Sequence, residues 1–268
     1  MNYRHGYHAG NFADVVKHIA LVAILQHLKK KDTAFAVIDS HAGRGRYDLS
    51  GSEAARTGEA ETGIARLRSL SGDMPEPLRE YLALANANPY PGSPLIAARL
   101  LRPQDRLTAV EKHPEEFAAL KAALAPFPNA LAENADGYAR LLKLLPPPAR
   151  RGVAVIDPPF ELPGEFEALG RAVTAATRKF ATGICLVWYP VKSQSAVDAF
   201  LGEVLAGGAA KALTIDTAIA APQGKLDRAG LLVINPPFGF AGQMGEAASR
   251  IAGLMDADIR VEWRAGSE

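Results

Sequence analysis

A short apolar run that ends in an acid and two prolines, residues 153–161, limits the fold of this chain more than any other segment. Its first four residues are apolar and mostly β-branched, which predicts a buried strand of a parallel sheet. Pro158 keeps Asp157 out of the helical conformation, and neither proline can donate a hydrogen bond to a neighbouring strand. The strand therefore ends in a rigid turn that presents the Asp157 carboxylate and the Phe160 ring. In open α/β sheets, ligands bind at this edge.

This turn suits the methylation of an exocyclic amine of adenine or cytosine. Such an amine is a weak nucleophile, because its lone pair is delocalised into the ring. The Asp157 carboxylate and the Pro158 carbonyl can accept both N–H bonds and turn the lone pair out of the ring plane, while Phe160 stacks on the base. A methyl donor in line then completes a displacement that depends on positioning and electrostatics. The same residues are also compatible with an ordinary Asp-Pro turn after a parallel strand.

The composition favours one large α/β domain with an insertion over two full domains. Of the 268 residues 48% are hydrophobic, and the net charge of +1 does not by itself indicate a nucleic-acid partner. The single cysteine, Cys185, excludes a disulfide within the chain, and the six histidines show no zinc-site spacing, so we expect no metal. Since no apolar run approaches the ~20 residues that span a bilayer, and no signal peptide is recognisable, we expect a cytoplasmic protein without membrane contact.

Two further strand ends predict a Rossmann-like cofactor site. Residues 33–39 form a predicted strand, and the glycines at 43 and 45 after it permit a tight turn and the close approach of a ligand. Residues 106–111 form the next strand, whose terminal acid, Glu111, is placed to bind ribose hydroxyls. The turn lacks the complete G-x-G-x-x-G pattern, which weakens the alternative of a nicotinamide-dependent oxidoreductase.

The stretch of sequence between these two strands is longer than one crossover helix needs. We therefore predict a helical insertion at residues 50–92, with helices near 53–70 and 75–86, and a Rossmann-like domain formed by residues 1–49 and 93–268. Ser93 is placed to cap the helix that follows, where an anionic cofactor group can also bind. Asp136, before a predicted helix, can accept a hydrogen bond from an adenine amine or cap that helix, and the sequence favours neither role.

The later segments predict a seven-stranded, mostly parallel sheet with antiparallel strands at one end, which is more typical of methyltransferases than of dehydrogenases. A second Pro-Pro-Phe follows Asn235. We reject it as the turn that binds the methyl acceptor, because that turn belongs at the fourth strand, near the middle of the sheet. Three successive lysines at positions 29–31 fit a solvated helix end or a patch that contacts phosphate.

Seven segments of the chain together resemble one known family. They are the motif from Tyr3 to His18 (Tyr-Arg-His-x-x-His-Ala-Gly-Asn-x-Ala-Asp-Val-x-Lys-His), the turn at 40–47, the Tyr-Pro-Gly-Ser-Pro of 90–94, Glu111, Asp136-Gly137, the Asp157 turn and the Asn235 turn. Over essentially its whole length, the chain is similar to the bacterial 23S ribosomal RNA adenine-N6 methyltransferases of the RlmJ type. Phe160 stands where relatives often have tyrosine, which keeps the stacking surface and removes a hydroxyl.

The resemblance implies a class I methyltransferase that uses S-adenosylmethionine, releases S-adenosylhomocysteine and modifies one adenine of 23S rRNA. The residues implied at the cofactor are His18, His41, Ser93, Glu111, Asp136, Gly137 and Asp157. Asp157, with Pro158 and Phe160 in its turn, would be catalytic, and Tyr3 and Phe160 would contact the RNA. We further expect a monomer whose macromolecular partner is 23S rRNA.

The sequence also leaves other functions open. The same chemistry can act on DNA adenine or on a protein glutamine amide, although no separate base-recognition domain is visible in the sequence. A non-catalytic RNA-binding factor is the second alternative, against which the intact Asp157 turn argues. We also predict that the insertion at 50–92 and the loop at 222–230 flank the RNA path.

Overall fold

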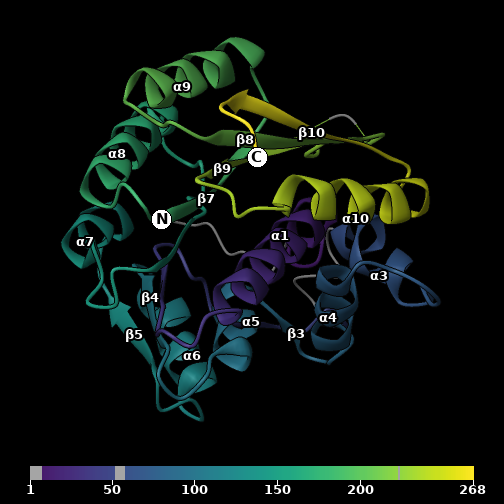
Figure 1. Ribbon diagram of the computed structural model, residues 1–268. Coiled ribbons are helices and arrows are strands. Elements are labelled where there is room, and N and C mark those ends of the chain that lie inside the picture. The colour runs from purple at the N-terminus through teal and green to yellow at the C-terminus, as the bar shows by residue number, and fades with distance from the viewer. Residues whose placement is uncertain (1–7, 52–57, 223) are drawn as a thin grey trace.

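The computed structural model describes residues 8–51, 58–222 and 224–268, which form an eight-stranded sheet between two layers of helices (Figure 1). The order across the sheet is β10-β8-β9-β7-β6-β1-β4-β5. The strands are β1 (Ala36–Asp39), β4 (Arg106–Glu111), β5 (Ala130–Asn134), β6 (Gly152–Ile156), β7 (Ile184–Pro190), β8 (Ala212–Ile219), β9 (Arg228–Ile234) and β10 (Ala257–Ala265). A separate two-stranded ribbon pairs β2 (Arg46–Tyr47) with β3 (Tyr90–Pro91).

The sheet confirms the predicted α/β class with mostly parallel strands. Strands β5, β4, β1, β6 and β7 run parallel to one another, whereas β9 is antiparallel to both β7 and β8. The predicted number of seven strands was one too low. The segment at Ala130–Asn134 and the C-terminal segment at Ala257–Ala265 both join the sheet, the latter by antiparallel pairing along β8.

Strand β6 explains why helices cover both faces of the sheet. It is the fourth sheet strand in chain order, it lies between β1 and β7, and it is buried along its whole length. Its alternate side chains enter two separate cores: Val153 and Val155 on one face, Ala154 and Ile156 on the other. This is the pattern expected of an apolar strand in the middle of a parallel sheet.

The helices divide between the two faces (Figure 1). Those whose buried residues join the core of Val153 are α1 (Phe12–Lys29), α5 (Ser93–Leu100), α6 (Pro114–Leu124) and α10 (Phe240–Met255). Those that join the core of Ala154 are α7 (Gly137–Leu144), α8 (Glu165–Lys179) and α9 (Gln194–Ala206). None of the helices in the described part of the chain has the length and apolar character that crossing a bilayer requires.

The segment at 50–92 packs against α1. Its elements are the 3-10 helix η2 (Glu59–Thr62), the short helix α3 (Ile64–Leu67) and α4 (Glu76–Ala85). Over the described residues, the helix predicted near 53–70 is present only as two short pieces, because the backbone of Gly63 (φ −132°, ψ −111°) is not helical. A side chain at Gly63 would collide with the backbone of Gly10 and Asn11. Buried residues of α3 and α4 belong to the same hydrophobic core as those of α1. Helix α1 is therefore covered by the sheet on one side and by α3 and α4 on the other. The division of the chain into two domains stays a prediction.

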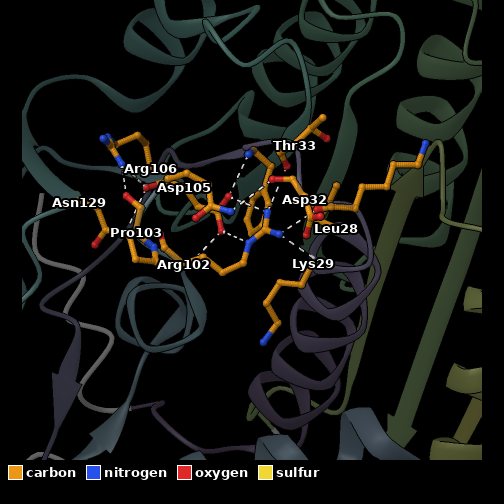
Figure 2. Close-up of polar contacts among 12 residues, drawn as sticks. Leu28, Lys29, Asp32, Thr33, Arg102, Pro103, Asp105, Arg106 and Asn129 are labelled. Atoms are coloured by element: carbon orange, nitrogen blue, oxygen red, sulfur yellow. Dashed lines mark hydrogen bonds and ion pairs between the residues drawn. The ribbon is translucent and has the colours of Figure 1, made fainter.

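A charged cluster fastens the loop between α1 and β1 at the amino edge of the sheet (Figure 2). Arg102 donates hydrogen bonds to the carbonyls of Lys31 (2.8 Å) and Thr33 (3.1 Å), and it pairs with Asp105 at 2.8 Å. Asp105, which is fully buried, also accepts from the backbone amide of Phe35 at 3.1 Å. The three successive lysines therefore lie near the edge opposite to the carboxyl ends of the parallel strands.

Candidate functional site

A cavity of about 490 Å³ opens at the carboxyl edge of the sheet. Seven residues predicted from the sequence line it: His18, His41, Ser93, Glu111, Asp136, Gly137 and Asp157. They come from α1, from the segments that follow β1, β4, β5 and β6, and from the start of α5. The structure thus brings together residues that are far apart along the chain, at the edge where open α/β sheets bind ligands.

Asp157 follows β6 directly and is held by a buried lysine that the sequence interpretation did not single out. Lys17 Nζ donates to Asp157 Oδ2 at 2.5 Å and to Asp14 Oδ1 at 2.7 Å. The side chain of Asp157 is 16% exposed, whereas those of Lys17 and Asp14 are buried. Burial lowers the pKa of Lys17, but the two carboxylates outweigh it and raise this pKa above its ordinary value. Lys17 therefore stays charged and orients one oxygen of Asp157.

Both carboxylate oxygens of Glu111 are oriented by backbone amides. The amide of Gly43 donates to Oε2 at 2.9 Å, and the amide of His113 donates to Oε1 at 2.7 Å. Gly43 has a φ of +60°, a conformation that favours glycine, so the predicted tight turn after β1 is present. Burial raises the pKa of Glu111, and the two amides oppose this effect in part. The carboxylate is thereby fixed in the cavity wall, and its binding of ribose hydroxyls stays a prediction.

Asp136 caps its helix and also lines the cavity. Its Oδ1 accepts from the amide of Ala139 at 3.1 Å, and its Oδ2 accepts from Lys112 Nζ at 3.0 Å. Gly137, the next residue, packs so closely on the turn after β1 that a Cβ there would lie 2.2 Å from the carbonyl oxygen of Ser40. The capping role left open by the sequence is therefore present, and a contact to an adenine amine stays a prediction.

His41 is a neutral, oriented histidine. The hydroxyl of Ser40 lies 2.8 Å from His41 Nδ1 and 3.1 Å from the Val155 carbonyl oxygen, so it fixes the orientation of the ring. Burial is the main reason that the pKa of His41 is lowered to about 4. The edge-to-face contact with the Tyr138 ring, at 4.9 Å between centroids, holds the imidazole in place.

Ser93 does not cap α5, contrary to the sequence prediction. The residue at the N-cap is Gly92, and Ser93 Oγ instead donates to Asp39 Oδ2 at 2.7 Å. Asp39 is the last residue of β1 and is 1% exposed, and burial is the main cause that raises its pKa to about 7. Its other carboxylate oxygen has no hydrogen-bond partner among the described residues. His18 is also buried, and its Nδ1 lies 2.8 Å from the Tyr90 hydroxyl.

Two predicted residues, Pro158 and Phe160, do not line the cavity. Pro158 is buried behind Asp157 in the turn. Phe160 has a φ of +50°, and its ring packs against those of Phe166 (4.8 Å between centroids) and Trp188 (5.8 Å). Tyr3 lies outside the described residues, so its predicted contact with RNA stays a prediction.

The second Pro-Pro-Phe lies at the opposite edge of the sheet. Asn235 follows β9, which runs antiparallel to β7, and its side-chain amide donates to the carbonyls of Ala181 and Gly183. Phe238 is 80% exposed. This turn therefore lies away from the edge that carries Asp157.

The sequence interpretation missed Lys17, Asp39 and Tyr138. A signal for Lys17 was available, because Asp14 and Lys17 are spaced i, i+3 within an otherwise apolar helix, where buried charges require partners. Asp39 ends the first strand, as Glu111 ends the second, and that position alone could have marked it. In the ranges that the structure describes, no group of three or more His, Cys, Asp or Glu residues is arranged to hold a metal ion.

Comparison with known proteins shows one consistent family. A family model described as "Ribosomal RNA large subunit methyltransferase D, RlmJ" matches residues 32–265. Two proteins named ribosomal RNA large subunit methyltransferase J are similar: that of Escherichia coli is 39% identical, over 91% of this chain and 90% of its own length, and that of Haemophilus influenzae is 38% identical, over 92% and 91%.

A crystal structure has the same fold over almost the whole chain. Protein LPL1258 of Legionella pneumophila matches with a TM-score of 0.88 and 31% identity, over 97% of this chain and 99% of that protein. The family model covers every strand of the sheet and the Asp157 turn. The chain belongs to the RlmJ family of ribosomal RNA large subunit methyltransferases.

Proposed function

We propose that this protein transfers the methyl group of S-adenosylmethionine to N6 of one adenine in 23S rRNA and releases S-adenosylhomocysteine. The observation that carries the proposal is the position of Asp157. It follows the central strand β6, lines the cavity and is held by the charged Lys17 at 2.5 Å. Membership of the RlmJ family supports both the reaction and the substrate.

The donor set of the cavity fits S-adenosylmethionine. The carboxylate of Glu111, aimed by two backbone amides, suits ribose hydroxyls, and Asp136 suits the amine of the cofactor's adenine. At Gly137 the wall of the cavity carries no side chain. The carboxylate oxygen of Asp39 that has no hydrogen-bond partner in the described ranges lies buried beside Ser93, which lines the cavity. When bound, this cofactor supplies a methyl group activated by a positively charged sulfur.

The Asp157 turn activates the acceptor by holding it. Oδ2 of Asp157 is occupied by Lys17, and Oδ1 has no protein donor in the described ranges, so Oδ1 can accept one N–H of the adenine amine while the Pro158 carbonyl accepts the other. Both bonds turn the nitrogen lone pair away from the ring and toward the methyl group. Bound S-adenosylmethionine would supply the methyl group and would leave as S-adenosylhomocysteine, and the proton that N6 gives up would pass by way of Asp157 Oδ1 to solvent. Phe160, fixed by its aromatic neighbours, is the proposed stacking surface.

Replacement of Asp157 by alanine or asparagine tests the proposal. We expect at least about a 1000-fold loss of methyl transfer to 23S rRNA in an assay with labelled cofactor, since alanine removes the acceptor and asparagine brings donors to it. Asp198→Asn, an exposed position on α9, is the matched control and should keep full activity. A folded Asp157→Ala protein with near-normal activity would exclude the mechanism.

The acceptor and the assembly state need separate measurements. Mass spectrometry of rRNA and DNA nucleosides from a deletion strain separates an rRNA adenine from a DNA adenine, and peptide mass spectrometry detects a methylated glutamine. Failure of the protein to bind S-adenosylhomocysteine in calorimetry would favour a non-catalytic RNA-binding factor. We also propose that the protein acts as a monomer, which light scattering at working concentration tests.

A further inference from the structure

A leucine at the mouth of the cavity is largely uncovered. Leu162 follows the Asp157 turn, lines the cavity and is 70% exposed. The other large hydrophobic side chains that are exposed in the described ranges, Leu131, Phe238 and Leu254, do not line the cavity. Covering an exposed leucine with an apolar surface is favourable, so a ligand that covers Leu162 gains affinity from the contact.

A hydrogen bond holds the loop of Leu162 against the opposite wall of the cavity. The hydroxyl of Tyr138 donates to Glu165 Oε1 at 2.7 Å. Tyr138 follows Asp136 and Gly137 directly, and residues 161–165 line the same cavity. The bond therefore joins the wall that carries Asp136 to the loop that carries Leu162.

We propose that Leu162 packs on the adenine ring of bound S-adenosylmethionine, and that the Tyr138–Glu165 hydrogen bond positions the loop for this contact. The inference rests on the proposed function, because it takes S-adenosylmethionine as the ligand. The adenine ring is the flat, weakly polar part of this cofactor. Since Asp136 is the proposed partner of the adenine amine, the ring lies beside the wall to which Tyr138 ties the loop. Leu162 then covers the ring from the solvent side.

Calorimetry with S-adenosylhomocysteine, without RNA, tests the contact. We expect Leu162→Ser to raise the Kd about tenfold, from loss of most of the burial of one leucine. Leu131→Ser, which changes an exposed leucine on β5 outside the cavity, is the matched control and should leave the Kd unchanged. Tyr138→Phe should raise the Kd about threefold, because it removes one hydrogen bond. Glu165→Gln keeps an acceptor oxygen for the Tyr138 hydroxyl and should raise the Kd less than Tyr138→Phe does.

The inference is overturned if folded Leu162→Ser binds S-adenosylhomocysteine with an unchanged Kd. If its KM for 23S rRNA then rises, Leu162 contacts the RNA instead of the cofactor. Absence of any binding by the wild type would instead contradict the proposed function itself. Matching melting temperatures establish that each variant is folded.

Discussion

Because Lys17 holds Asp157 in place, we expect its buried ammonium group to be essential for methyl transfer. Lys17→Met keeps an apolar stem of similar length and leaves Asp14 and Asp157 without their shared partner. We expect methyl transfer to fall at least about 100-fold, because Asp157 is then no longer held in place. Single-turnover assays with labelled cofactor measure this effect. Lys29→Met is the matched control on the same helix, where Lys29 pairs with Glu80 at 3.7 Å, and it should retain activity.

Asp39 makes the stability of the protein depend on pH. Burial raises its pKa to about 7 in the folded state, against an ordinary value of 3.8, so between these values the folded protein holds a proton that the unfolded chain releases. The contribution of Asp39 to stability therefore falls as pH rises from about 4 to about 7 and is constant above that range. Asp39→Asn does not titrate, and its amide oxygen can still accept from Ser93.

The predicted effect is a difference in the free energy of unfolding between Asp39→Asn and the wild type. Relative to the wild type, Asp39→Asn should gain free energy of unfolding, on the order of a few kcal/mol, between pH 4 and pH 7. Urea unfolding at several pH values measures this gain. Two stability curves that run parallel across this range would show that the pKa of Asp39 is not raised.

At the scale of secondary-structure elements, the corner between β5 and α7 has to touch the turn after β1. Gly137→Ala would place a methyl group 2.2 Å from the Ser40 carbonyl oxygen and 2.7 Å from His41 Nε2. We expect a loss of roughly 2 kcal/mol or more of stability, and weaker binding of S-adenosylhomocysteine, because a backbone carbonyl cannot rotate away as a flexible side chain can.

Gly202, within α9, provides the matched control. A Cβ there would meet no atom within 4 Å, so Gly202→Ala should stabilise the protein by up to about 1 kcal/mol through helix propensity. Chemical unfolding and calorimetry of the two variants measure both effects. Equal stability of Gly137→Ala and the wild type would contradict the close packing of this corner.

At the scale of the whole molecule, the cavity edge is the side on which we expect the RNA. Strand β8 is antiparallel to β9 and therefore parallel to β6, so the loop after β8 emerges at the same edge as Asp157. Lys225 in this loop lies close enough to Glu59 of the 50–92 segment to lower the pKa of that glutamate, although other groups contribute more. The loop and the insertion are thus neighbours, which supports the prediction that they flank the RNA path.

Neutralising Lys225 and Arg228 together tests this prediction. Because each phosphate contact releases counterions, we expect weaker RNA binding and a slope of log affinity against log salt that is reduced by about two. The matched control neutralises Lys30 and Lys31 at the amino edge, and it should change neither quantity if those lysines are only a solvated helix end. An unchanged slope in the first variant would exclude the loop from the RNA interface.

Much of the fold followed from local patterns. The strand Arg106–Glu111 lies where the sequence predicted it, and so does the buried strand before Asp157. These segments were predictable because apolar periodicity and the backbone limits of proline act within a few residues. The interruption at Gly63 of the helix predicted near 53–70 was not predictable, because Gly63 there packs on the backbone of Gly10 and Asn11, which are far away in the sequence.

The chain's own local chemistry was thus enough to predict the central strand, the rigid turn after it and the acids Glu111 and Asp157 at two strand ends, although it did not single out Asp39 at a third. Packing alone decided the partners of those acids: Asp157 with Lys17, 140 positions away, and Asp39 with Ser93. A buried charge binds whichever donor the folded chain brings to it, and that choice depends on how helices and strands pack, which no short stretch of sequence contains.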